Sequence, residues 1–122
     1  MTFTKLTRRS AEAADWTPAV DIAETGDRFV LTADLLGVSP EDIEISLEDS
    51  VLTLAGRRTD VEAEGRRRHY AERRNGRFLR RFTLPATIDG DRIEARSAYG
   101  TLEITVPKRA EVQPRRIEVA AA

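Results

Sequence analysis

The sequence contains no cysteine and only one histidine, His69, among its 122 residues. The absence of cysteine excludes disulfides, thiolate nucleophiles and cysteine-ligated zinc or iron–sulfur centres. A single histidine excludes multi-histidine metal sites and leaves every serine with the same one possible imidazole partner. The glycines form no recognisable phosphate-binding loop. We therefore predict that the protein is not an enzyme and that it needs no metal or cofactor.

Long hydrophobic runs are also missing. No apolar stretch approaches the roughly 18 residues of a membrane helix, and the first residues lack the apolar centre of a signal peptide. Aromatic residues make up 6% of the chain, but the hydrophobic share of 40% suffices for the core of one small domain. We expect a single soluble domain, located in the cytoplasm.

The net charge of −1 conceals an uneven distribution of charge. Residues 57–81 contain ten arginines and four acidic residues, a local charge of about +6. Arginine carries a planar guanidinium that pairs with carboxylates through two parallel hydrogen bonds. The residues alone leave three interpretations open: a segment that pairs with an acidic protein surface, a nucleic-acid-binding segment, or a solvated loop.

Hydrophobic and polar residues alternate along a series of short segments, a period typical of half-buried β-strands. In the first of them Phe29, Leu31, Ala33 and Leu35 share one side. The segments that follow this pattern are 27–36, 43–47, 51–55, 78–84, 93–96 and 102–106. The short turn 48–50 predicts an antiparallel hairpin. Short strands at regular spacing predict an all-β fold, a β-sandwich.

Three stretches do not fit a closed sandwich. Residues 1–15 have few large apolar residues and predict a short flexible N-terminal arm. Residues 57–77 exceed the usual loop length of about 12–15 residues, which favours a functional or disordered loop. In the tail 109–122, Ile117 and Val119 share one side of an extended chain. They are either part of a random tail or an anchor that adds a strand to a neighbour's sheet.

Over about residues 16–119 the sequence contains a series of motifs whose order resembles that of the small heat-shock protein, or α-crystallin, family. The N-terminal half of the resemblance rests on 16–22 (WTPAVDI) and on 29–38 (FVLTADLLGV) followed by PEDI. The C-terminal half rests on 75–78 (NGRF) with 82–85 (FTLP), 95–102 (ARSAYGTL), 106–108 (VPK) and the tail motif 117–119 (IEV).

This resemblance implies an immunoglobulin-like β-sandwich of two antiparallel sheets, an α-crystallin domain, over residues 16–108. In bacterial and plant members the long loop carries a short strand that pairs with the partner's sandwich. The implied dimer residues are Arg67, Arg68, His69, Tyr70, Ala71, Glu72 and Arg73, and Arg80 matches an interface-facing arginine of the animal branch. The tail anchor, Ile117 and Val119, is implied to enter a groove on another dimer lined by Ile43, Ile45, Leu47, Ile93 and Ala95.

The activity that the resemblance implies is that of an ATP-independent chaperone, a holdase that binds partly unfolded proteins. Its partners would be itself, as a dimer and higher homo-oligomer, and unfolded client proteins, with no specific nucleic acid and no membrane. The expected client-binding residues are Phe3, Leu6 and Trp16. The alternative is a nucleic-acid-binding or co-chaperone docking module that uses the arginine-rich loop.

The sequence departs from the family pattern at two places, and each departure leads to an expectation. The arm of about fifteen residues is short for the family, which predicts a smaller or less stable oligomer. Tyr99 and Thr101 flank Gly100 where the family commonly has asparagine and valine. If Gly100 adopts a positive φ, the turn survives these changes because glycine carries that conformation.

Overall fold

The computed structural model describes residues 14–59, 65, 67, 69–70, 72–114 and 116–121. None of these residues lies in an α-helix. Their strands are β1 (Val20–Glu24), β2 (Arg28–Asp34), β3 (Ile43–Glu48), β4 (Val51–Arg58), β5 (Gly76–Thr83), β6 (Glu94–Ala98) and β7 (Thr101–Pro107). Single 3-10 turns are η2 (Pro40–Asp42), η3 (Gly90–Arg92) and η4 (Ala110–Val112).

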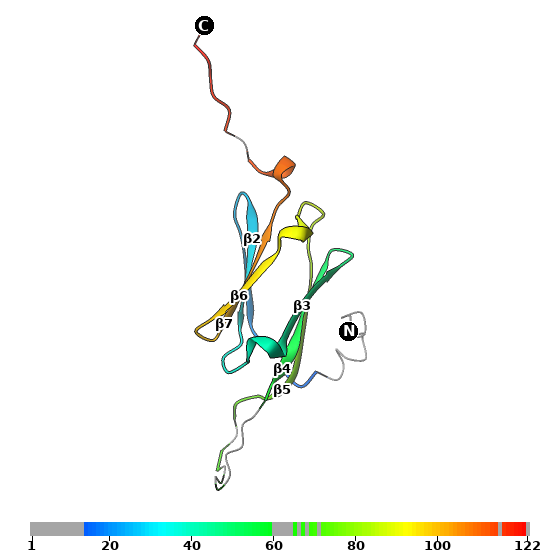
Figure 1. Ribbon diagram of the computed structural model, residues 1–122, viewed down its shortest axis with the longest axis vertical. Helices are drawn as coiled ribbons and strands as arrows, with labels where there is room; N and C mark the ends of the chain where they lie inside the picture. The colour runs from blue at the N-terminus through cyan, green and yellow to red at the C-terminus, as the bar shows by residue number, and fades with distance from the viewer. Residues whose placement is uncertain are drawn as a thin grey trace.

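The strands form two antiparallel sheets that lie face to face as two layers (Figure 1). One sheet has the order β1-β2-β7-β6 and the other the order β3-β4-β5. All strand pairs are antiparallel, including the hairpin of β3 and β4 that the turn at 48–50 predicts. The prediction of an all-β sandwich is confirmed.

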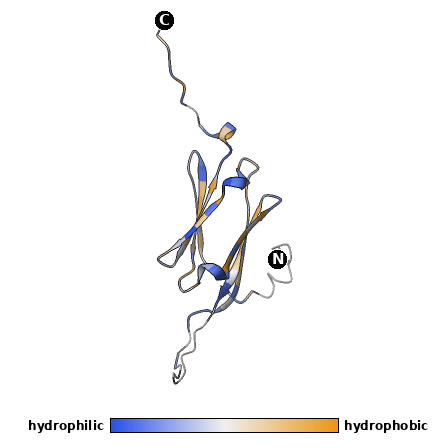
Figure 2. Ribbon diagram, in the orientation of Figure 1, coloured by the Kyte–Doolittle hydropathy of each residue, from blue (hydrophilic) through white to orange (hydrophobic). Residues whose placement is uncertain are grey.

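The core lies between the two sheets and follows from the alternation in the sequence. Hydrophobic and hydrophilic residues alternate along the strands (Figure 2), and the inward-facing residues are almost fully buried. They are Leu31, Ala33, Leu35, Leu52, Leu54, Phe78, Leu102, Ile104 and Val106. Full burial of one large aliphatic or aromatic side chain stabilises a fold by about 1.5–3 kcal/mol. These residues therefore hold the two sheets together.

Two tight turns contain residues with positive φ. Between β3 and β4, Asp49 and Ser50 have φ of 50° and 63°, a pattern that matches the right-handed twist of a hairpin. Between β6 and β7, Tyr99 and Gly100 have φ of 53° and 78°. Gly100 thus has the positive φ that the sequence analysis stated as a condition. The carbonyl of Gly100 also accepts a 2.9 Å hydrogen bond from the amide of Leu35, which ties this turn to the end of β2.

The hairpin of β4 and β5 is longer than the sequence predicts. Arg57 pairs with Arg77 and Arg58 pairs with Gly76, so two residues at each end of the predicted loop 57–77 belong to strands. Backbone pairing in a ladder does not require apolar side chains. Arginine-rich strand ends therefore give no hydrophobic alternation, and the connection between the strands shortens to 59–75.

Candidate functional site

The candidate dimer segment lies in the connection between β4 and β5, away from both sheets (Figure 1). Arg67, His69, Tyr70, Glu72 and Arg73 are all exposed, and the side chain of Tyr70 is 85% exposed. Arg68 and Ala71, which belong to the same predicted set, lie outside the described residues. The described part of the segment therefore offers its side chains to the surroundings instead of to its own core.

Arg80, the predicted interface arginine, is tied to its own subunit. It lies in β5 and is partly buried. Its Nη1 donates a 3.0 Å hydrogen bond to the carbonyl of Pro18, and its guanidinium lies 4.9 Å from the ring centroid of Phe82. Arg80 therefore fixes the stretch before β1 onto β5 within one subunit.

Trp16 belongs to the core, which corrects the expectation that it binds clients. Its side chain is only 7% exposed, and its ring packs at 5.1 Å from that of Phe78. Its Nε1 donates a 2.9 Å hydrogen bond to the carbonyl of Gly76. A buried indole with a satisfied N–H presents no apolar surface to a client. The other two predicted client residues, Phe3 and Leu6, lie outside the described residues.

Arg58 covers the indole of Trp16, a contact that the sequence analysis did not predict. Its guanidinium carbon lies 4.2 Å from the ring centroid, and Nη1 donates a 2.8 Å hydrogen bond to the carbonyl of Arg74. Burial, with a smaller contribution from repulsion by Arg73, lowers the pKa of Arg58 below its usual range. The arginine-rich strand end therefore has a structural role in closing the core. In the folded chain Arg58 pairs with Gly76 at a strand end. An arginine and a distant glycine are too weak a signal in the sequence to predict this contact.

The predicted groove residues lie on two sheet edges. Ile43, Ile45 and Leu47 are on β3, the edge of the three-stranded sheet. Ile93 precedes β6, the edge of the four-stranded sheet, and Ala95 lies within it. All except Ala95 are partly buried and pack against the core cluster.

A contact between Leu47 and the η3 turn brings these two edges together. A Cβ built on Gly90 would lie 2.7 Å from Cδ2 of Leu47. The end of β3 therefore lies beside the turn that leads into β6. The predicted residues Ile43, Ile45, Leu47 and Ile93 are thus partly open to solvent on these two edges.

Both residues of the predicted tail anchor are exposed to solvent. Residues 116–121 follow η4 without further helix or strand, and this part of the chain extends away from the sandwich (Figure 1). The side chains of Ile117 and Val119 are 81% and 95% exposed. Exposed aliphatic side chains on an extended segment have no core of their own to join.

Among the described residues, no three His, Cys, Asp or Glu side chains gather as metal ligands. No helix in the described part of the chain is long and apolar enough to cross a membrane.

Comparison with known proteins gives a consistent result. The model of the Hsp20/alpha crystallin family matches residues 21–120. Spore protein SP21 of Stigmatella aurantiaca is 43% identical over 106 residues, which are 86% of this chain and 63% of that protein. Small heat shock protein C2 of Rickettsia felis is 38% identical over 103 residues, which are 84% of this chain and 67% of that protein. The crystal structure of a small heat-shock protein from Xylella fastidiosa has a TM-score of 0.73 at 44% identity, and the match covers 88% of this chain and 100% of that one.

The sandwich is therefore an α-crystallin domain, as the sequence motifs implied. The chain belongs to the Hsp20/alpha crystallin family of small heat shock proteins. It spans less than two thirds of the length of the Stigmatella relative, and about two thirds of the Rickettsia one.

Proposed function

We propose that the protein is an ATP-independent holdase of the cytoplasm, which binds partly unfolded proteins and works as dimers that assemble into larger homo-oligomers. The proposal rests on family membership together with one observation: two aliphatic side chains, Ile117 and Val119, are exposed on an extended tail that its own sandwich does not cover. The proposed receiving surface consists of Ile43, Ile45, Leu47, Ile93 and Ala95, of which all but Ala95 are partly buried against the core cluster.

Dimerisation is proposed to use the exposed segment 67–73 and the outer edge of β1. β1 pairs only with β2 in the subunit, so its other edge has backbone groups that no strand of the described chain satisfies. Ile22, on this strand, is 48% exposed. A segment with exposed backbone and side chains can add a strand to such an edge in a second copy. This pairing would use the long loop and leave both cores unchanged.

Assembly beyond the dimer is proposed to use the tail anchor. Burial of two such aliphatic side chains is worth roughly 2–5 kcal/mol before the entropic cost of association. Each tail contact is therefore weak and reversible by itself. Several contacts in one oligomer act together, so the assembly is stable while its subunits can still exchange.

Client binding is proposed to involve Phe3 and Leu6 of the N-terminal arm, and Trp16 is withdrawn from this set because it is buried. A holdase needs exposed apolar area within a soluble charged shell, because partly unfolded chains expose apolar groups that native proteins bury. Binding of this kind needs no nucleotide and no covalent step, which agrees with the prediction that the protein is not an enzyme.

The test combines two measurements on the purified protein and on the double variant Ile117→Ala, Val119→Ala. Size-exclusion chromatography with light scattering gives the oligomer mass, and an aggregation assay with a heat-labile client in the absence of ATP gives the activity. We expect the wild type to be oligomeric and to suppress aggregation. We expect the double variant to give smaller species with an unchanged circular dichroism spectrum, because neither side chain is buried in the subunit.

Glu118→Ala is the matched control, since Glu118 lies between the two anchors and is exposed. It should keep the wild-type mass. A wild-type monomer without suppression would contradict the holdase proposal, and an unchanged mass of the double variant would contradict the role of the tail. Sub-micromolar, sequence-dependent binding of duplex DNA at physiological salt would instead favour the nucleic-acid alternative.

A further inference from the structure

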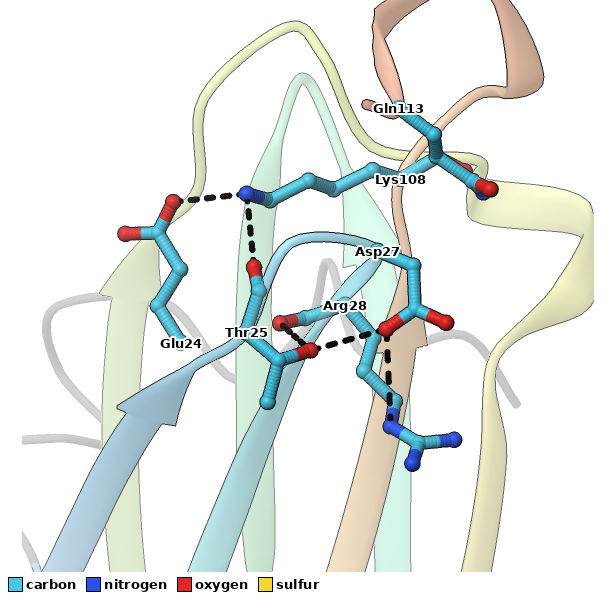
Figure 3. Close-up of polar contacts among 6 residues, drawn as sticks. All are labelled: Glu24, Thr25, Asp27, Arg28, Lys108 and Gln113. Carbon is cyan, nitrogen blue, oxygen red and sulfur yellow. Dashed lines mark hydrogen bonds and ion pairs between the residues drawn. The ribbon is translucent and has the colours of Figure 1, made fainter. Parts of the chain in front are cut away.

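Lys108, the residue directly after β7, makes an unusual number of contacts for a surface lysine. Its Nζ donates a 2.7 Å hydrogen bond to Oε2 of Glu24, with which it forms an ion pair, and a 2.9 Å hydrogen bond to the carbonyl of Thr25 (Figure 3). Nζ also lies 5.3 Å from the ring centroid of Phe29. The Lys108 side chain is only 14% exposed. This amine therefore joins the end of the last strand to the β1–β2 hairpin.

The main chain around Lys108 is held at the same place. The amide of Lys108 donates to the carbonyl of Asp27 at 2.8 Å, and the amide of Arg109 donates to the carbonyl of Thr87 at 2.8 Å. The side chain of Gln113 then reaches back across η4, and its Nε2 donates a 2.8 Å hydrogen bond to the carbonyl of Lys108. η4 is thereby closed against the body of the domain.

The chain after η4 touches the same hairpin. A Cβ built on Gly26, in the turn between β1 and β2, would lie 3.2 Å from Cγ of Pro114. Pro114 therefore lies against the β1–β2 turn. The tail beyond it is described from residue 116 onward and is exposed.

We propose that Glu24, Lys108 and Gln113 form a tail clamp, which positions the anchor residues Ile117 and Val119 for contact with another subunit. The inference rests on the proposed role of the tail in assembly. The clamp residues are positioning residues: they touch no second subunit themselves, and they act by fixing the direction and the free length of the tail.

The free length follows from the residue numbers. With the clamp closed, Ile117 is the third residue after Pro114, a reach of about 10 Å at 3.3–3.6 Å per residue. With the clamp open, the last residue whose backbone amide is held to the sandwich is Arg109, eight residues before Ile117, and the reach grows to about 27 Å. The effective concentration of a tethered group falls with the 3/2 power of the tether length, so opening the clamp lowers it about fourfold.

The ion pair is suited to this role because of where its two ends lie. The lysine end is shielded, and the glutamate end is 57% exposed. The neighbouring ion pair of Arg109 and Glu111, at 3.4 Å, is exposed at both ends and links residues of the same short segment. It cannot attach the tail to the sandwich, so Glu111 provides a matched control.

A direct measurement of tail position tests the clamp without relying on assembly. The natural chain has no cysteine, so spin labels can be attached specifically to Thr83→Cys in β5 and Arg116→Cys in the tail. The background carries Ile117→Ala and Val119→Ala, so that the tail cannot dock, and labelled protein is diluted into unlabelled protein. We expect Lys108→Met with Gln113→Ala to widen the distance distribution about twofold, because the tether from the last held residue to residue 116 grows from two residues to seven. Glu111→Gln should leave the width unchanged.

The second measurement is made in chains with the natural anchor. The concentration at which the oligomer half-dissociates on dilution should rise about fourfold in the Lys108→Met, Gln113→Ala variant, and by less in Glu24→Gln. An unchanged distance distribution overturns the clamp. A wider distribution with an unchanged dissociation midpoint overturns its positioning role. Failure of the tail itself to act in assembly is seen separately, as an unchanged mass of the Ile117→Ala, Val119→Ala variant without clamp substitutions.

Discussion

Replacement of Trp16 with alanine is expected to destabilise the sandwich strongly, although Trp16 precedes the first strand. The side chain fills the space between Phe78 and the guanidinium of Arg58, and it is 7% exposed. Its backbone amide also donates to the carbonyl of Arg77, so the residue is held to β5 from both ends. The prediction therefore concerns folding stability and not client capture.

The magnitude follows from the separate contacts of the indole. Truncation of a buried aromatic residue to alanine costs about 3–5 kcal/mol through lost burial and the remaining cavity. Trp16→Phe keeps most of the apolar packing and an aromatic partner for Phe78, but it removes the hydrogen bond to the carbonyl of Gly76, a cost of about 1 kcal/mol. Since small domains are stable by only about 5–15 kcal/mol, the alanine variant should lose a large share of its stability.

Urea unfolding followed by far-ultraviolet circular dichroism, at one fixed protein concentration for all variants, measures the difference. Trp16 is the only tryptophan, so in the wild type its fluorescence reports the same transition from the site itself. We expect the order wild type, Trp16→Phe, Trp16→Ala in decreasing stability. A Trp16→Ala protein with wild-type stability and weakened client binding would refute the assignment of Trp16 to the core and restore its predicted role in client binding.

Two further predictions concern the turns. Gly100→Val should lower the free energy of unfolding by roughly 2 kcal/mol, because a β-branched residue is strained at a φ of +78°. Tyr99→Gly should be neutral or stabilising, because Tyr99 is fully exposed and has a φ of +53°. Urea unfolding of both variants checks the two directions. The 2.8 Å hydrogen bond from the Thr25 hydroxyl holds the pKa of Asp27 below its usual 3.8, so its contribution to stability is present above that pH and is lost as the pH falls through the lowered pKa. Thr25→Val should raise this pKa in a carboxyl NMR titration, and an unchanged pKa would show that the hydroxyl is not its cause.

The strands were predictable because one face of each sheet is buried and the other meets solvent. Apolar residues therefore recur at every second position of a strand, as at Leu31, Ala33 and Leu35. For Gly100 the sequence supported only a conditional statement, since a positive φ is most easily adopted by glycine, and the structure supplies the φ itself. The groove and tail residues came from the family resemblance, and the structure adds that Ile117 and Val119 are exposed.

The role of Trp16 was not predictable from its neighbours in the sequence. An aromatic residue in a polar stretch before the first strand is equally consistent with an exposed contact and with a core residue. Its burial depends on Phe78 and Gly76, about sixty residues away, which only the folded chain brings to it. The two extra pairs of the β4–β5 hairpin were missed for the same reason, because backbone pairing between arginine-rich ends leaves no pattern in either segment.

The sequence by itself determined the fold class, the family, the tight turns and the two exposed apolar residues of the tail, because all of these depend on local alternation, glycine conformation or short motifs. The tertiary structure alone decided which charged residues have structural roles. Lys108 meets Glu24 across eighty-four residues, and Arg58 covers a tryptophan forty-two residues before it in the chain. Such contacts join segments that are close in space but distant in sequence, so no local pattern of residues predicts them.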